Sequence, residues 1–210
     1  KIRTDARFNE RDLRLLEVHE GWVHVGTTLN GMSQPICTFL SKGPPSSTVT
    51  QEGLAILMEV LAAAQLLQDD FGVASDVWSA PSLNELRRDG LDTERWNTLH
   101  PESEPRIPYV QSCLEGHAGP IVVATDYMKI VGEQIRPFLP ERRLLALGTD
   151  GFGRSDTRAS LREFFEVDRH FILVSALKAL ADEGSVPRSL VSEALQRYQI
   201  NPEKTNPMKP

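Results

Sequence analysis

A glycine-rich segment in the second half of the chain carries residue types that often contact anions. It runs from Gly148 to Ser155, with further glycines at Gly151 and Gly153. Glycines let backbone amides approach a phosphate closely, and the N-terminus of a following helix carries positive partial charge. The spacing matches neither the dinucleotide fingerprint nor the P-loop, and no lysine follows the last glycine. The pattern therefore favours a structural turn or a domain interface over a phosphate site.

Charged residues follow two of the expected strands at the places where open α/β sheets gather ligands. Asp126 and Lys129 follow one strand, and Asp150 and Arg154 follow the next. Helix capping explains the aspartates equally well, and from the residues alone we favour the interpretation in which Asp126 and Asp156 cap helices and Arg154 pairs with a neighbouring carboxylate. The alternative is contact with an anion, a partner or a neighbouring domain, and the candidate residues for it are Asp126, Lys129, Asp150, Gly151, Gly153, Arg154 and Ser155.

Three histidines are the remaining candidates for chemistry. His100 and His117 stand in loop-like segments, and His170 stands at the start of an apolar helix. Histidines with neither a partner motif nor a nucleophile are more often hydrogen-bonded or solvated side chains than catalysts. The sequence shows no nucleophile elbow, H-E-x-x-H motif or paired catalytic carboxylates. We therefore predict no catalytic, cofactor-binding or metal-ligating residue.

The composition of the chain argues against several classes of binding partner and of cellular location. The chain has 210 residues and a formal net charge of −6, which gives no long-range attraction for nucleic acid or anionic lipid. No apolar stretch approaches the roughly 18 residues of a membrane span, and no secretory signal is evident. Cys37 and Cys113 are far apart and form no C-x-x-C pattern, so inert thiols are expected. These features predict a globular, cytosolic protein.

Hydrophobic patterning predicts alternating helices and strands. A helix is expected from Leu54 to Phe71, ended by Gly72, and apolar runs predict strands at Val73–Ser79, Pro120–Ala124 and Leu144–Leu147. Between the first two strands we expect a short helix from Pro81 through Leu86, a turn at Asp89-Gly90, a short helix from Thr93 and a loop from His100 to Pro108. A helix from Asp126 to about Phe138 is expected between the second and third strands. Three helices are expected after the third strand, from Asp156 or Thr157 to Phe165, from Arg169 to Glu183 and from Arg188 to Tyr198.

This alternation indicates an α/β fold with a small, mainly parallel sheet flanked by helices. Residues 1–53 show no sustained period and stay an unassigned, irregular N-terminal segment, which includes an expected linker at Ser41–Ser47. Residues 54–200 form the predicted domain, and residues 201–210 form a polar tail.

Several runs of sequence resemble one known family. In order, they are SDVWS from Ser75, LRRDG from Leu86, ERWN from Glu94, TDYMK from Thr125, LGTDGFGRSDTR from Leu147, and the tail from Ile200 to Pro207. Together they resemble the C-terminal domain of homodimeric bacterial pyruvate dehydrogenases, which is a transketolase-like C-terminal domain. The resemblance covers about three-quarters of the chain, from about Leu54 onward.

The resemblance implies a small, mostly parallel sheet that follows two larger domains. The family's metal and diphosphate motif, its cofactor-activating glutamate and its active-site histidine segment all lie upstream, so no catalytic residue is carried over. The whole enzyme is expected to decarboxylate pyruvate on thiamine diphosphate with magnesium. It would pass the acetyl unit to a lipoyl group of the dihydrolipoyl acetyltransferase component.

Residues 1 to about 53 depart from the family pattern, in which we expect a strand entering a glycine-serine-glycine turn before Leu54. We therefore consider this segment a reading-frame artefact or an unrelated fusion. Three functions follow: an enzyme fragment that supports the dimer and the remaining domains, a free-standing α/β module that binds a small anion or a partner protein, and a non-functional remnant.

Overall fold

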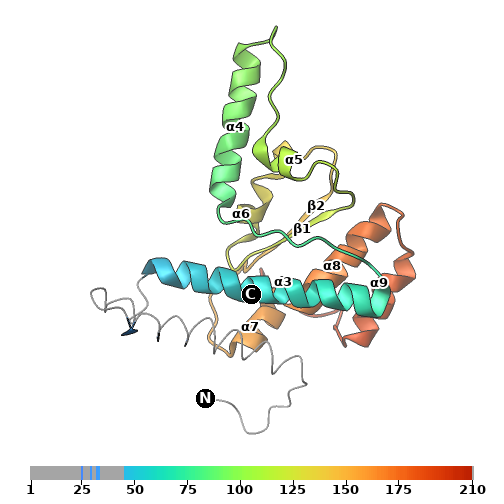
Figure 1. Cartoon of the computed structure of the whole chain (residues 1–210). Helices are drawn as coiled ribbons and strands as arrows, with labels where there is room; N and C mark the ends of the chain where they lie inside the picture. The colour runs from blue at the N-terminus through green and yellow to red at the C-terminus, as the bar shows by residue number, and fades with distance from the viewer. Residues whose placement is uncertain (1–24, 26–28, 30–31, 34–44, 210) are drawn as a thin grey trace. The chain divides into compact units, whose positions relative to one another are not determined.

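The computed structural model describes residues 45–209 together with Val25, Leu29, Met32 and Ser33 (Figure 1). The chain divides into two compact units, Lys1–Glu59 and Val60–Pro210. The second unit contains the sheet and all of the residues singled out above for possible chemistry. None of the helices among the described residues has both the length and the hydropathy of a membrane-spanning segment.

The first helix in the described residues is α3, Pro45–Phe71. Its end at Gly72 is confirmed: Gly72 has φ +66°, its N–H donates to Gln68 O at 3.1 Å, and Val73 N–H donates to Leu67 O at 3.0 Å. This left-handed ending satisfies carbonyls that the last turn leaves open. The expected linker is wrong at Pro45–Ser47, which form the first turn of α3, where proline is tolerated.

The sheet in the described residues consists of two parallel strands, β1 Ile121–Ala124 and β2 Leu144–Leu147. Ile121 pairs with Leu144 and Ala124 with Leu147, so both strands end at the same edge. These two strand predictions are confirmed. The predicted strand at Val73–Ser79 is wrong, because this segment is irregular and mostly exposed, and its few apolar residues cannot cover two faces.

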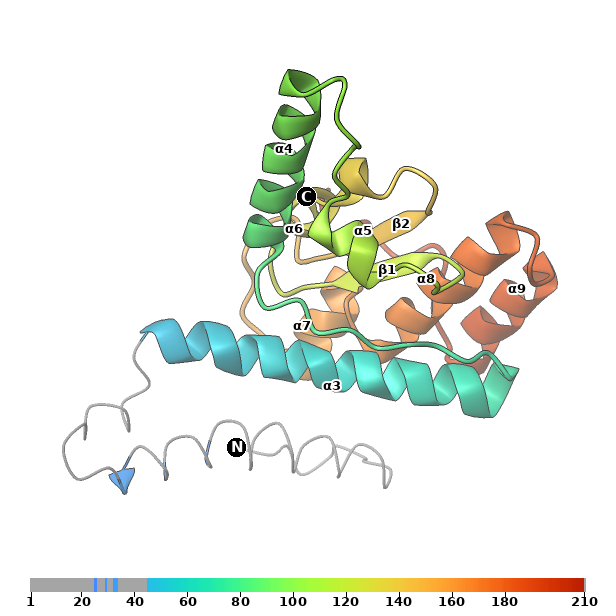
Figure 2. The same cartoon turned by 45° about the horizontal axis from the view of Figure 1, so that its top comes forward.

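Helices cover both faces of the sheet, as the α/β prediction requires (Figure 2). Because alternate residues of a strand point to opposite faces, Val122 and Ala124 pack with one core and Ile121 and Val123 with the other. The first core joins the end of α3 to α8 (Arg169–Asp182) and α9 (Arg188–Arg197); its buried residues are Ala63, Leu66, Leu67, Ile172, Leu173, Leu177 and Ala194. The second contains Val110, Ile135, Phe138, Leu139 and Leu144.

Helix α4, Leu83–Leu99, corrects the prediction of two short helices. It is continuous, begins at the N-cap Ser82, and carries Gly90 inside it rather than in a turn. A Cβ at Gly90 would lie 2.6 Å from the ring of Phe138, so this glycine allows close packing. In Figures 1 and 2, α4 extends away from the sheet and the loop after it returns alongside, as the three prolines between His100 and Pro108 predict.

The segment after β1 corrects a second helix prediction. Instead of one helix capped by Asp126, it forms α6 (Lys129–Glu133) and the 3-10 turn η3 (Arg136–Phe138), and Met128 stands at the N-cap of α6. Pro137 has no N–H to continue an α-helical ladder, which explains the break.

Short helix α5, Tyr109–Cys113, was not predicted. Cys113 is a free thiol, and its side chain hydrogen-bonds with Tyr109 and so raises the pKa of that phenol. Cys37 lies outside the described residues.

The C-terminal helices are confirmed with nearly the predicted bounds. Helix α7 spans Arg158–Phe165, and Thr157 caps it by accepting a hydrogen bond from Ser160 N–H at 3.3 Å. Helices α8 and α9 follow, and residues 201–209 form two turns.

Candidate functional site

Parallel pairing brings the segments that follow β1 and β2 together at the carboxyl edge of the sheet. Lys129 N–H donates to Asp150 Oδ2 at 2.9 Å, and Thr149 N–H donates to Tyr127 O at 2.9 Å. The Thr149 hydroxyl donates to Asp126 O at 2.7 Å. Asp126, Lys129 and Asp150, which the sequence singled out separately, therefore lie in one hydrogen-bonded site.

Gly148 allows this close approach. A Cβ at this position would stand 2.4 Å from Tyr127 O and 2.6 Å from Lys129 N, and both of those atoms belong to backbone. Neither can move aside as a flexible side chain would, so the two loops can pack in this way only around a glycine. The first glycine of the glycine-rich segment, Gly148, is therefore needed for close packing between the two loops.

Asp126 contacts a buried arginine that the sequence analysis missed. Its Oδ2 lies 3.6 Å from Arg162 Nη2, and the Arg162 side chain is only 7% exposed. A signal for Arg162 was present, because it precedes Phe165 by three residues and so lies on the same, inward face of α7. Buried charges in proteins are normally paired, which gives Asp126 a structural role at this edge.

Gly151 and Gly153 have different requirements. Gly151 has φ +118°, and a Cβ there would lie 2.3 Å from Pro207 O of the tail. A Cβ at Gly153 would meet nothing within 4 Å, and Gly153 does not have a positive φ. Of the two, Gly151 is the position that needs glycine.

Arg154 and Ser155 are both exposed. The guanidinium carbon of Arg154 lies 4.2 Å from the centroid of the Phe164 ring on α7. This is a cation–π arrangement that connects the loop to α7.

Several apolar side chains at this edge are exposed to solvent. Phe152 is 76% exposed, and it follows Gly151, whose backbone meets Pro207. The group, which we call the carboxyl-edge surface, consists of Tyr127, Met128, Ile130, Phe152 and Met208, each more than half exposed. Exposed apolar side chains on segments that meet at one edge of a sheet are a feature of surfaces that contact another protein or domain.

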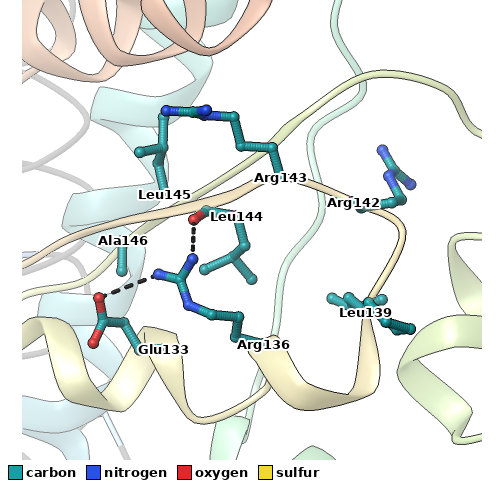
Figure 3. Close-up of a pocket in the computed structure, with 9 residues that line it drawn as sticks. Glu133, Arg136, Leu139, Arg142, Arg143, Leu144, Leu145 and Ala146 are labelled. Atoms are coloured by element: carbon teal, nitrogen blue, oxygen red, sulfur yellow. Dashed lines mark hydrogen bonds and ion pairs between the residues drawn. The ribbon is translucent and has the colours of Figure 1, made fainter. Parts of the chain in front are cut away.

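A hollow at the opposite end of β2 contains three arginines (Figure 3). Each guanidinium already has protein partners: Arg136 donates to Leu144 O at 2.7 Å, Arg142 donates to Gly119 O at 2.9 Å, and Arg143 lies 2.6 Å from Asp182 Oδ2. These contacts fix the entry to β2 and explain the arginines without a bound anion. The hollow is therefore better explained as structure than as a ligand site.

Asp182, near this hollow, forms ion pairs with two cations, Arg143 and Lys178. It accepts a hydrogen bond from Lys178 Nζ at 2.5 Å, and that bond, together with the nearby charge of Arg143, holds the pKa of Asp182 below its usual value. The Arg143–Asp182 ion pair joins α8 to the residue before β2, and the Lys178–Asp182 ion pair lies within α8.

The histidines have structural partners, as expected. His100 hydrogen-bonds Trp96 O at 2.8 Å and stacks on the Trp96 ring. His117 lies 2.9 Å from Asp76 Oδ2, and His170 stacks on Tyr198.

The described residues do not fit a magnesium and thiamine diphosphate site. Within residues 45–209 no three histidine, cysteine or carboxylate side chains gather as metal ligands would. At the carboxyl edge, the Thr149 and Lys129 amides that could face a diphosphate already donate within the protein.

Two family models match the chain. Residues 46–168 match the transketolase-like TK C-terminal domain, and this range contains both strands and the carboxyl-edge loops. Residues 1–68 match a model described as microtubule-associated tyrosine carboxypeptidase. The second match covers less than half of the chain and overlaps the first along α3.

Relatives of known name agree with the first model. The chain is 57% identical to the pyruvate dehydrogenase E1 component of Pseudomonas aeruginosa and 55% identical to that of Cupriavidus necator, each over 153 residues. Each alignment covers 73% of this chain and 17% of the relative. The component of Buchnera aphidicola from Baizongia pistaciae aligns over 195 residues at 37% identity, which is 90% of this chain and 22% of the relative. The chain thus spans about a fifth of these proteins, is homologous to their C-terminal region, and belongs to the transketolase-like C-terminal domain family.

Proposed function

We propose that this chain is a C-terminal domain fragment of a thiamine-diphosphate-dependent pyruvate dehydrogenase E1 component, and that it is not catalytic alone. The observation that carries the proposal is 57% identity over 153 residues to 17% of the Pseudomonas aeruginosa component. The fragment supports domain and dimer architecture. Its location in the cytosol stays a prediction from sequence.

The whole enzyme, in this proposal, decarboxylates pyruvate with thiamine diphosphate and magnesium and transfers the acetyl unit to a lipoyl group. The partners of the chain are then the remaining domains, a second subunit and the dihydrolipoyl acetyltransferase component. The cofactor supplies the carbanion chemistry when it is bound elsewhere in the enzyme. The residues of this chain contribute only packing and positioning.

We place the contact with the remaining enzyme at the carboxyl-edge surface. Tyr127, Met128 and Phe152 are more than half exposed, while the backbone beneath them is fixed by the bonds between the two loops. A fixed backbone that presents apolar side chains needs little ordering on contact, which favours association. The alignments cover 17% and 22% of the relatives, and the remainder of an E1 component supplies a partner for such a surface.

Residues 1 to about 53 are, in this proposal, a reading-frame artefact or an unrelated fusion. The match of residues 1–68 to a different family model supports it, whereas the long Buchnera alignment is the observation that weighs against it. The genomic sequence upstream of the codon for Leu54 tests it. Family-like codons in another frame directly upstream would support an artefact, whereas one uninterrupted frame that continues into a complete E1 component would contradict the proposal.

A chimera tests the enzyme assignment. The 153 aligned residues of the Pseudomonas aeruginosa component would be replaced by those of this chain, and pyruvate decarboxylation would be measured. We expect turnover within about tenfold of the parent enzyme, because a domain that only positions its neighbours changes the barrier by no more than about 1.4 kcal/mol. A soluble dimeric chimera with bound cofactor but no turnover would contradict the proposal.

The same chimera locates the contact surface. Phe152→Ser should weaken dimer or domain association, while the matched control Leu99→Ser, another exposed apolar position at the end of α4, should not. Equal behaviour of the two variants in sedimentation and turnover would show that the carboxyl-edge surface is not the contact.

A further inference from the structure

The C-terminal tail of residues 201–209 is shaped by two asparagine turns. Asn201 Oδ1 accepts a hydrogen bond from Glu203 N–H at 2.9 Å, and Asn206 Oδ1 accepts one from Met208 N–H at 2.9 Å. Asparagine side chains that bond backbone two residues ahead hold a chain in a turn without regular structure. The tail therefore has a defined path even though it contains no helix or strand.

The first turn directs Lys204 to the end of α7. The Lys204 ammonium donates to Phe164 O at 2.8 Å and also to Glu163 O, and it lies 3.5 Å from Glu166 Oε1. Carbonyls of the last helical turn lack partners within the helix and carry negative partial charge, so a cation is favoured there. The Lys204 side chain is only 20% exposed, which makes this an anchored contact.

The second turn places Pro207 against the glycine-rich loop. Pro207 O would lie 2.3 Å from a Cβ at Gly151, so the tail and the loop touch backbone to backbone. Gly151 also has φ +118°, a conformation that side-chain-bearing residues rarely adopt. The loop can follow this path beside the tail only because residue 151 is glycine.

The loop and the tail meet the same aromatic ring. The Arg154 guanidinium lies 4.2 Å from the Phe164 ring centroid, and the Lys204 ammonium lies 5.8 Å from it. The Lys204 ammonium also lies 4.8 Å from the Phe171 ring of α8. Tail, loop, α7 and α8 thus converge at one point.

We propose that residues 201–209 are a strap that fixes the loop Gly148–Ser155 against the C-terminal end of α7, with Lys204 as its anchor. The strap sets the position of Phe152 and Met208 in the carboxyl-edge surface. The proposal concerns the folded chain itself and stands whether or not this surface contacts the rest of an E1 component.

Two readouts on the full 210-residue chain test the strap. The first is the exchange rate of the Thr149 and Lys129 amides, which bond between the loops, measured by NMR. The second is the rate of trypsin cleavage after Arg154. Lys204→Met keeps the apolar stem and removes the ammonium; we expect both rates to rise about tenfold, because hydrogen bonds from a charged group are lost. Lys209→Met, at an exposed position of the same tail, is the matched control.

A second pair of variants tests the contact at Pro207. Gly151→Ala should raise both rates, and Gly153→Ala should leave them unchanged, because a Cβ at Gly153 meets nothing. The amides of β1 and β2 distinguish a local from a global effect. If Lys204→Met left the loop rates unchanged, or raised the strand amides by the same factor, the strap assignment would be wrong.

Discussion

Gly90 lies inside a helix although glycine has a low helix propensity. Glycine lowers helix stability by about 1 kcal/mol relative to alanine, yet Gly90 lies within the 17-residue helix α4. The Phe138 ring occupies the space where a Cβ would be, at 2.6 Å, and Phe138 is 3% exposed. Packing across the second core therefore decides this position, against helix propensity.

We accordingly expect Gly90→Ala to lower the free energy of unfolding by about 1–2 kcal/mol, since overpacking exceeds the gain in propensity. Urea unfolding would measure it. Gly53→Ala is the matched control: Gly53 lies in α3 with nothing within 4 Å of a Cβ, so a gain of about 0.5–1 kcal/mol is expected. Stabilisation by Gly90→Ala would contradict the packing argument.

Asp182 gives a prediction about pH. The hydrogen bond from Lys178 and the charge of Arg143 lower its pKa in the folded state, so its stabilising effect is present above the unfolded-state pKa of about 3.9. That effect is lost as the pH falls through the lower, folded pKa. Asp182→Asn should therefore be less stable than the parent chain near neutral pH, and the difference should shrink in acid.

Urea titrations across this pH range would measure the difference. Asp92→Asn, an exposed aspartate on α4, serves as the control. A destabilisation of Asp182→Asn that is the same at neutral pH and in strong acid would exclude the ion pairs as its cause.

At the scale of elements, caps determine where the C-terminal helices begin. Asp168 Oδ1 accepts hydrogen bonds from His170 N–H at 3.0 Å and from Phe171 N–H at 2.9 Å, which satisfies two amides of the first turn of α8. Helix α8 then supplies Ile172, Leu173 and Leu177 to the first core. The cap thus fixes the register of a helix on which one face of the sheet depends.

We expect Asp168→Ala to cost about 1–2 kcal/mol of stability, and Asp168→Asn a few tenths, because asparagine caps helices nearly as well as aspartate. Thermal and urea unfolding would measure both variants. Equal losses for the two would mean that the charge of Asp168, rather than its capping bonds, provides the stability.

At the scale of the whole molecule, the described residues form an α/β unit with a core on each face of its sheet, and among them no three metal-ligating side chains gather. Calorimetry of the 210-residue chain with thiamine diphosphate and magnesium should therefore show no binding, and the same sample should not decarboxylate pyruvate. Chelation of divalent metal should leave its thermal unfolding unchanged. Tight binding or turnover would mean that residues 1–44 supply a site, and the proposed function would be wrong.

The elements whose signals are local could be predicted from the amino-acid sequence. Gly72 ends α3 and Thr157 starts α7 because left-handed glycine and hydroxyl caps act within a few residues. The strands at Ile121–Ala124 and Leu144–Leu147 were predictable because each is a compact apolar run that must be buried on both faces. The runs shared with pyruvate dehydrogenases indicated the family.

Features that depend on residues distant in the sequence became visible only in the folded structure. Gly90 resembles a turn residue until Phe138 is placed against it, and Val73–Ser79 resembles a strand although it pairs with neither β1 nor β2. Likewise, the sequence does not show which of positions 151 and 153 must be glycine. The answer, position 151, follows only from the position of Pro207, which lies 56 residues further along the chain. Local sequence cannot encode such contacts, because they arise only when separate elements pack together.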